Sequence, residues 1–141
     1  MSDAKPIHQA TQDLFQNIGF PEVSITIDHQ EDTTLVDVQV PADTSGVLIG
    51  YHGETINSLQ LILSLIVHQV AKTWIHLTLN INDYRQRRQE NLHEMAQAAA
   101  KQARDSGTEV IMPQMESYDR RAIHMVLSDQ PDITTESVGE G

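Results

Sequence analysis

The chain has 141 residues, a hydrophobic fraction of 39% and a formal net charge of −11, a length that suits one average domain or two small ones. It contains no cysteine, which excludes disulfides and thiolate sites and suits a reducing cytoplasm. The N-terminus lacks the features of a signal peptide, and the longest apolar run, residues 61–67, is too short to span a bilayer. We therefore expect a soluble, cytoplasmic protein.

The acidic charge is unevenly distributed. Residues 1–82 carry two basic and nine acidic side chains, whereas residues 83–124 carry seven of each. An acidic chain is a poor general ligand for nucleic acid, so any affinity for phosphate must come from a local cluster within residues 85–121. We expect that affinity to be modest and to fall steeply as the salt concentration rises.

The first 82 residues predict helices and strands in alternation. Apolar residues recur at helical spacing over residues 6–18. Two runs of alternating apolar residues, 23–28 and 35–40, predict an antiparallel hairpin. The remaining elements of this half are a short helix reaching Ile49, a longer helix over 55–72 and a third strand over 74–81.

The longer helix carries apolar residues on more than one side. A broad face is expected to point toward the sheet and contains Ile56, Leu59, Ile62, Leu63, Ile66, Val67 and Val70. Leu61 and Leu65 fall on the opposite side, which a monomeric core does not need. They are a candidate partner surface, although isolated exposed leucines are common in soluble proteins.

A Gly-x-x-Gly sequence, Gly50-Tyr51-His52-Gly53, separates the short helix from the long one. Glycines lack a Cβ and allow close backbone approach, and free N–H groups at the next helix start favour an anion such as phosphate. KH domains clamp about four nucleotides with such a loop. Residues 6–82 resemble a type II KH domain in the order of their elements. Two alternatives stay open: the glycines only turn the chain, and His52 is merely exposed.

The second half predicts a helix from Tyr84 to Ser106, short strands over 109–112 and 133–137, and a helix over 117–128. Helical spacing puts Arg85 and Arg88 on the same side as the apolar stripe of the first of these helices. They are expected to point toward the junction of the two halves. Whether they contact RNA or hold the halves together through acidic partners is left open.

Arg120 and His124 are four residues apart in the last helix and so share one face. A guanidinium fork and an imidazole together can bind phosphate and donate to, or stack on, a base. The plainer alternative is a surface helix in which Asp119 pairs with a neighbouring arginine.

Three further stretches carry a family resemblance: Tyr84–Glu90, Met112–His124 and Thr135–Gly141. With the Gly-x-x-Gly order, they resemble the Jag family (SpoIIIJ-associated proteins, also called KhpB or EloR). Its members join a KH domain to a single-stranded nucleic-acid-binding domain named R-3-H after its Arg-x-x-x-His. The resemblance implies an α+β fold, with a type II KH domain (α-β-β-α-α-β) over residues 5–82 and a small α/β domain over 83–141.

The resemblance also implies function. Relatives are cytoplasmic bacterial RNA-binding proteins, post-transcriptional regulators linked to cell elongation, division and envelope synthesis, and they can pair with a small single-KH protein. Single-stranded RNA is the expected partner, with single-stranded DNA left open. The nucleic-acid-binding residues carried over, with three arginines as electrostatic support, are Gly50, Tyr51, His52, Gly53, Arg120, Arg121, His124, Arg85, Arg87 and Arg88.

Three departures from the family pattern matter. The middle of the KH loop is usually basic, whereas here it is Tyr51-His52. The N-terminal Jag domain of longer relatives is not expected in this sequence. The family usually continues into an arginine-containing last strand, so we expect the sequence to be cut short at Gly141 and to lack that strand.

Two other classes of function were weighed. One is a KH-mediated interaction module, a homodimer or a heterodimer with a small KH protein, with weak affinity for nucleic acid. The other is an enzyme. Glu90 and His93 have the Glu-x-x-His spacing of carboxylate-bridged metal sites, but those sites need a second copy that this chain lacks. We therefore expect no enzyme, no metal and no cofactor. The RNA target, base preference and oligomeric state do not follow from the sequence.

Overall fold

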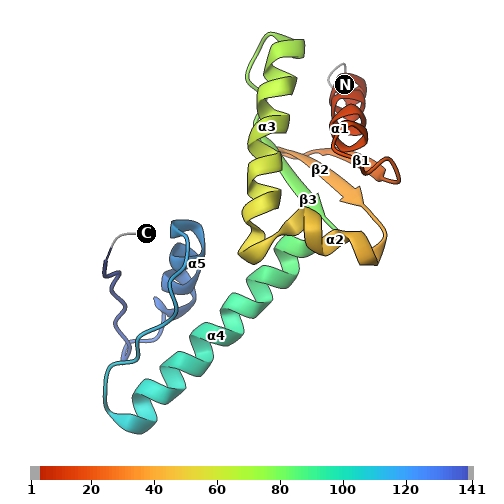
Figure 1. Cartoon of the computed structure of the whole chain (residues 1–141). Helices are drawn as coiled ribbons and strands as arrows, with labels where there is room; N and C mark the ends of the chain where they lie inside the picture. Colours follow the sequence, from red (N-terminus) through yellow and green to blue (C-terminus); the bar gives the residue numbers. More distant parts are fainter. Residues whose placement is uncertain (1–3, 140–141) are drawn as a thin grey trace. The chain divides into compact units, whose positions relative to one another are not determined.

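The structure is a computed structural model that describes residues 4–139, and the chain divides after Arg85 into two compact units (Figure 1). The elements of the first unit, in chain order, are α1 (Ala4–Asn17), β1 (Ser24–His29), β2 (Thr34–Gln39), α2 (Ala42–Ile49), a 3-10 turn (Tyr51–Gly53), α3 (Glu54–Ala71) and β3 (Leu77–Ile81). This is the predicted order α-β-β-α-α-β. The third strand is shorter than predicted, because it begins at Leu77 rather than at residue 74.

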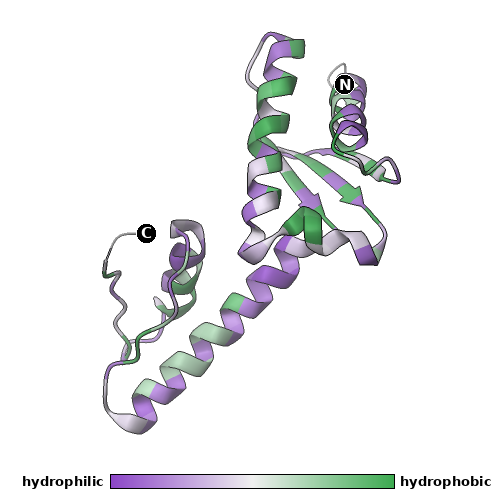
Figure 2. Ribbon diagram, viewed as in Figure 1, coloured by the Kyte–Doolittle hydropathy of each residue, from purple (hydrophilic) through white to green (hydrophobic). Residues whose placement is uncertain are grey.

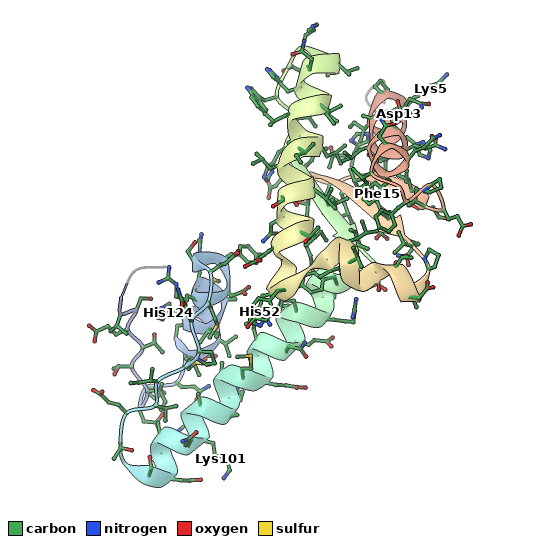
Figure 3. The ribbon with its side chains drawn as sticks, viewed as in Figure 1. Lys5, Asp13, Phe15, His52, Lys101 and His124 are labelled. Carbon is green, nitrogen blue, oxygen red and sulfur yellow. The ribbon has the colours of Figure 1, made fainter. Side chains whose placement is uncertain are left out.

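The three strands form one sheet in the order β1-β2-β3. β1 and β2 are the predicted antiparallel hairpin, with Ile27 opposite Val36, and β3 joins β2 in parallel, with Val36 opposite Leu79. These residues lie on the face that α1 and α3 cover. Phe15 of α1 is fully buried there (Figure 3). The result is an aliphatic core between two helices and one side of the sheet.

Helix α3 buries a narrower stripe than the sequence predicts. Its buried residues are Ile56, Leu59, Leu63 and Val67. Ile62 and Val70, which were expected to face the sheet, are 44% and 57% exposed. Successive residues in a helix are about 100° apart, so Ile62 cannot share the direction of its buried neighbour Leu63. Leu61 and Leu65 are exposed as predicted, and Figure 2 shows hydrophobic colouring along much of α3.

The other face of the sheet is polar, and a carboxylate lies in its middle row. Thr26, Asp37 and Asn80 are in register across the three strands. Burial raises the pKa of Asp37, repulsion from Asp83 raises it further, and a hydrogen bond with Gln39 acts in the opposite direction. The charged form of Asp37 is therefore disfavoured in the folded state.

Asp37→Asn is expected to stabilise the first unit at pH 7, by no more than about 0.5 kcal/mol since the side chain is partly exposed. A carboxyl whose folded pKa is raised costs stability when ionised, and that cost disappears as the pH falls through the folded pKa. The advantage of the variant should therefore vanish in acid. Urea unfolding followed by the fluorescence of Trp74, the chain's single tryptophan, measures it. Glu22→Gln, at an exposed loop position, is the control. Lower stability of Asp37→Asn at pH 7 would contradict the prediction.

The second unit consists mainly of two helices. α4 (Tyr84–Ser106) begins with the last two residues of the first unit, and α5 (Ser117–Leu127) follows after a long irregular segment. Both helices are where the sequence predicts them. Their shared core contains Leu92, Ala96 and Ala100 from α4 with Met115, Ile123 and Leu127.

The two strands predicted for this unit are wrong. Residues 109–112 and 133–137 are irregular, so within the described residues the second unit is helical rather than α/β. Apolar alternation alone does not make a strand, because each strand needs a partner to complete its ladder of hydrogen bonds. Ile111 is 86% exposed, without a covering layer. The final Glu140-Gly141 of the third family stretch lies outside the described residues.

Side chains hold the segment after α5 in place instead of a strand ladder. Arg104 of α4 donates from Nε to Asp132 at 2.7 Å and from Nη2 to the other Asp132 oxygen at 3.0 Å, and it also donates to Gln130. The hydrogen bond from Arg104 lowers the pKa of Asp132. Ile133, next along the chain, packs against the core of the unit. The contacts of Asp132 and Ile133 thus hold the beginning of the C-terminal segment against the second unit.

Candidate nucleic-acid interface

The predicted site residues fall into both units. Gly50, Tyr51, His52, Gly53 and Arg85 belong to the first unit, and Arg87, Arg88, Arg120, Arg121 and His124 belong to the second. The KH loop and the Arg-x-x-x-His face are therefore two separate candidate sites, each with its own geometry.

The backbone of the KH loop requires glycine at both of its ends. Gly50 has φ 75° and ψ −179°, and Gly53 is left-handed at φ 85°. A Cβ at Gly53 would lie 2.8 Å from the hydroxyl oxygen of Tyr84. The alternative that these glycines turn the chain is thus supported by geometry. It does not exclude ligand contact, because the same bare backbone lets a ligand approach.

The two residues between the glycines form an aromatic pair in place of a basic pair. The rings of Tyr51 and His52 stack with centroids 3.9 Å apart and an interplanar angle of 24°. Tyr51 is 73% exposed, and His52 is held at a positive φ of 53°. His52 is labelled at this loop in Figure 3. Exposed aromatic faces can stack on bases, which is a sequence-tolerant way of holding a single strand.

Arg85 donates hydrogen bonds to groups of the first unit. Its Nε donates to the carbonyl oxygen of Leu79 at 2.7 Å, and its Nη2 donates to Gln60 at 2.9 Å and Asn57 at 3.3 Å. Helical spacing predicted that Arg85 points toward the junction of the two halves, whereas these contacts lie within the first unit. These three partners are a carbonyl oxygen and two amide oxygens, so Arg85 fastens β3 to α3.

Arg88 pairs with Asp119 inside the second unit. Its Nη2 lies 2.8 Å from a carboxylate oxygen of Asp119, and the two side chains are 14% and 8% exposed. Asp119 does pair with an arginine, but the arginine comes from α4 and the pair is buried, so the alternative of a surface helix with a neighbouring arginine is wrong in both respects. This ion pair joins α4 to α5.

Arg88→Met is expected to destabilise the second unit by about 3 kcal/mol, because it leaves the carboxylate of Asp119 buried without its partner. The loss should appear in the helical circular dichroism signal but not in Trp74 fluorescence, since Trp74 lies in the first unit. Arg87→Met is the matched control at an exposed neighbouring position. Equal stability of the two variants would show that the ion pair contributes little.

One face of α5 opens onto a cavity of about 520 Å³. It is lined by Ser117, Arg120, Arg121, His124, Met125, Ser128 and Ser137. No carboxylate is among these residues, although the chain as a whole is strongly acidic. Arg121 is exposed, and within residues 4–139 no carboxylate forms an ion pair with it. The cavity is therefore lined by two arginines and three serines, and by no acidic side chain.

His124 is engaged through both ring nitrogens. Its Nδ1 lies 2.5 Å from the Thr135 hydroxyl oxygen, and its Nε2 lies 3.1 Å from that of Ser137. Figure 3 labels His124 on α5. Sequence reasoning missed both hydroxyl residues as site residues. The only signal was their place in a stretch that carried the family resemblance.

Two family models match the chain. One is the KH domain of KhpA/KhpB, over residues 8–79, and the other is the R-3-H domain, over residues 90–141. The fold and the two sites thus define a KH domain followed by an R-3-H domain. The chain belongs to the KhpA/KhpB family, in the two-domain form represented by KhpB, as the Jag resemblance predicts.

Similar proteins are found in several bacteria. A protein of Clostridium symbiosum is 33% identical over 118 residues, which cover 84% of this chain and 53% of that protein. A protein of Lactiplantibacillus plantarum is 32% identical over 84% of this chain and 37% of its own length, and one of Bacillus subtilis is 29% identical over 79% and 55%. All three are named RNA-binding protein KhpB. The chain spans about half, or less, of each relative.

The family is non-enzymatic, in agreement with the sequence-based prediction. Within residues 4–139, no group of three or more histidine, aspartate and glutamate side chains is placed to hold a metal ion. None of the described helices is both long enough and apolar enough to cross a membrane.

Proposed function

We propose that this chain binds single-stranded RNA through two sites, the KH loop of residues 50–53 and the cavity on α5. The observation that carries the proposal is the cavity, which Arg120 and Arg121 line together with three serines and no carboxylate, on a chain of net charge −11. The names of the relatives support RNA as the ligand. We take residues 5–82 and 83–141 as the domains that carry the two sites.

The two sites are proposed to bind different parts of the RNA. The KH loop offers close backbone approach and the stacked rings of Tyr51 and His52, so it holds bases. The cavity offers guanidinium groups, so it holds phosphate. Arg85 and Arg88 support the sites by fixing the elements around them, because each guanidinium group binds a side chain of another element. Arg87, which is exposed, adds positive charge.

Fluorescence anisotropy with short labelled RNA oligonucleotides tests the proposal. Tyr51→Ala/His52→Ala is expected to weaken binding about tenfold, since stacking contributes about 1–3 kcal/mol for each base. Glu22→Gln, distant in sequence and exposed, should leave binding unchanged. The same oligonucleotides as DNA measure the preference for ribose. Unchanged affinity of the Tyr51/His52 variant would remove the KH loop from the binding surface.

In the cell, the proposed role is that of a cytoplasmic post-transcriptional regulator linked to cell elongation, division and envelope synthesis, as the Jag resemblance implies. Crosslinking and sequencing of bound RNA tests this role. Transcripts of those processes should be enriched with the wild type and depleted with an Arg120→Ala/Arg121→Ala variant. Equal recovery with both proteins would reject a regulatory role that acts through the cavity.

A second candidate function is a KH-mediated interaction module, with a second copy or a small single-KH protein as partner. It is favoured by the outer side of α3, where Leu61, Ile62 and Leu65 are 62%, 44% and 50% exposed. Sedimentation equilibrium of the wild type and of Leu61→Asp/Leu65→Asp tests it. A monomer at all concentrations, with and without a single-KH protein, would reject this function.

A further inference from the structure

The segment that follows α5 reaches the candidate phosphate site through His124. Thr135 and Ser137 each place a hydroxyl oxygen against one of the two ring nitrogens of His124. Ser137 also lines the cavity beside Arg120 and Arg121. An exposed segment without regular secondary structure is thus attached to the site by two side-chain hydrogen bonds.

The two hydroxyl groups cannot play the same hydrogen-bonding role toward a neutral His124 ring. A neutral imidazole has one N–H donor and one acceptor nitrogen, whereas each hydroxyl has one proton and two lone pairs. One hydroxyl must therefore accept from the ring and keep its own proton for an outside partner. The other must donate to the ring and presents lone pairs only. In both tautomers of a neutral His124 ring, the pair offers one outward O–H donor and free lone pairs on both hydroxyl oxygens.

Glu136 lies between the two residues that contact His124, so these contacts also affect where its carboxylate lies. Glu136 stands between two residues whose side chains both meet the same ring, and its own side chain does not line the cavity. While both hydroxyls hold His124, the carboxylate of Glu136 is directed elsewhere. A released segment would let that carboxylate reach Arg120 and Arg121 and compete with phosphate for them.

We propose that Thr135 and Ser137 are positioning residues of the RNA site. They fix the ring of His124, bring the Ser137 hydroxyl to the cavity as a direct contact, and hold Glu136 away from the arginines. The inference rests on the proposed function of the cavity. It extends the binding surface beyond the Arg-x-x-x-His motif to a segment 11 to 13 residues further along the chain.

Anisotropy with single-stranded RNA tests the inference on the full chain. Thr135→Val/Ser137→Ala is expected to weaken binding about tenfold, the loss of roughly one net hydrogen bond plus the competing carboxylate. Thr134→Val is the matched control, because its exposed hydroxyl makes no bond to His124 among the described residues. Adding Glu136→Gln to the double variant should restore part of the affinity, whereas Glu136→Gln alone should change it less than twofold.

A second readout separates positioning from general loosening of the fold. Long-range proton–nitrogen NMR spectra report the tautomer of each histidine ring, and the His124 ring signals should shift in the double variant but not in Thr134→Val. Wild-type RNA affinity in the double variant, or unchanged His124 ring signals, would overturn the inference. If Arg120→Ala/Arg121→Ala also binds like the wild type, the proposed function fails. If the arginine variant is weak and the hydroxyl variant is not, only the positioning role fails.

Discussion

Arg120→Ala/Arg121→Ala is expected to lower the affinity for single-stranded RNA about 100-fold at low salt. The two guanidinium groups line the same cavity, and a hydrogen bond to a charged group contributes about 1.5–3 kcal/mol. Loss of two phosphate contacts should also reduce the slope of log affinity against log salt by about 1.4, at roughly 0.7 for each phosphate of a single strand. Anisotropy titrations at four or more salt concentrations measure both quantities.

Circular dichroism of the same variant separates loss of phosphate contacts from loss of the fold. A variant that merely unfolds the second unit loses affinity and helical circular dichroism together, whereas loss of phosphate contacts leaves the helices intact. Arg121→Ala alone should weaken RNA binding about tenfold, because one hydrogen bond to a charged group is lost. The stability of this variant should stay close to that of the wild type, since Arg121 is exposed. Lys101→Ala is the control for net charge. Lys101 is 79% exposed, pairs with Asp105 and does not line the cavity. Equal losses for Arg121→Ala and Lys101→Ala would mean that only net charge matters.

Local patterns predicted most of the fold. The period of apolar residues fixed the helices and the hairpin, and the glycine spacing marked the KH loop. These features depend on neighbours in sequence, which is why residues 84–106 were predicted to be a helix with the bounds that α4 has. The predicted strands over 109–112 and 133–137 failed for the opposite reason. A strand depends on a distant partner, and no such partner is present among the described residues.

The site divides in the same way. Arg120 and His124 were predictable because four residues along a helix bring two side chains to one face. The contacts of His124 with Thr135 and Ser137 were not, since an irregular segment has no period from which to infer a direction. The helical spacing of α4 predicted that Arg85 and Arg88 point toward the junction of the two halves, and their contacts instead lie within the first and the second unit respectively. It could not identify their partners, which come from other elements.

Gly50→Ala is expected to destabilise the first unit by about 4 kcal/mol, a large part of the stability of a small domain. With φ 75° and ψ −179°, Gly50 occupies a region that is essentially limited to glycine. An added Cβ would lie 2.2 Å from the Thr55 hydroxyl oxygen and 2.9 Å from the Thr55 backbone nitrogen. The hydroxyl can rotate away, but the backbone nitrogen belongs to the first turn of α3 and cannot. Urea unfolding followed by Trp74 fluorescence measures the loss.

Gly46→Ala is the matched control in the same part of the chain. Gly46 lies inside α2, and a Cβ there would meet nothing within 4 Å. Alanine exceeds glycine in helix propensity by about 1 kcal/mol, so this variant should be more stable than the wild type. Equal, small effects at both positions would show that the KH loop relaxes around a side chain. If the large difference is found, loss of RNA binding in a Gly50 variant reports unfolding rather than a missing contact. The KH site must then be tested at Tyr51 and His52, whose side chains the fold does not bury.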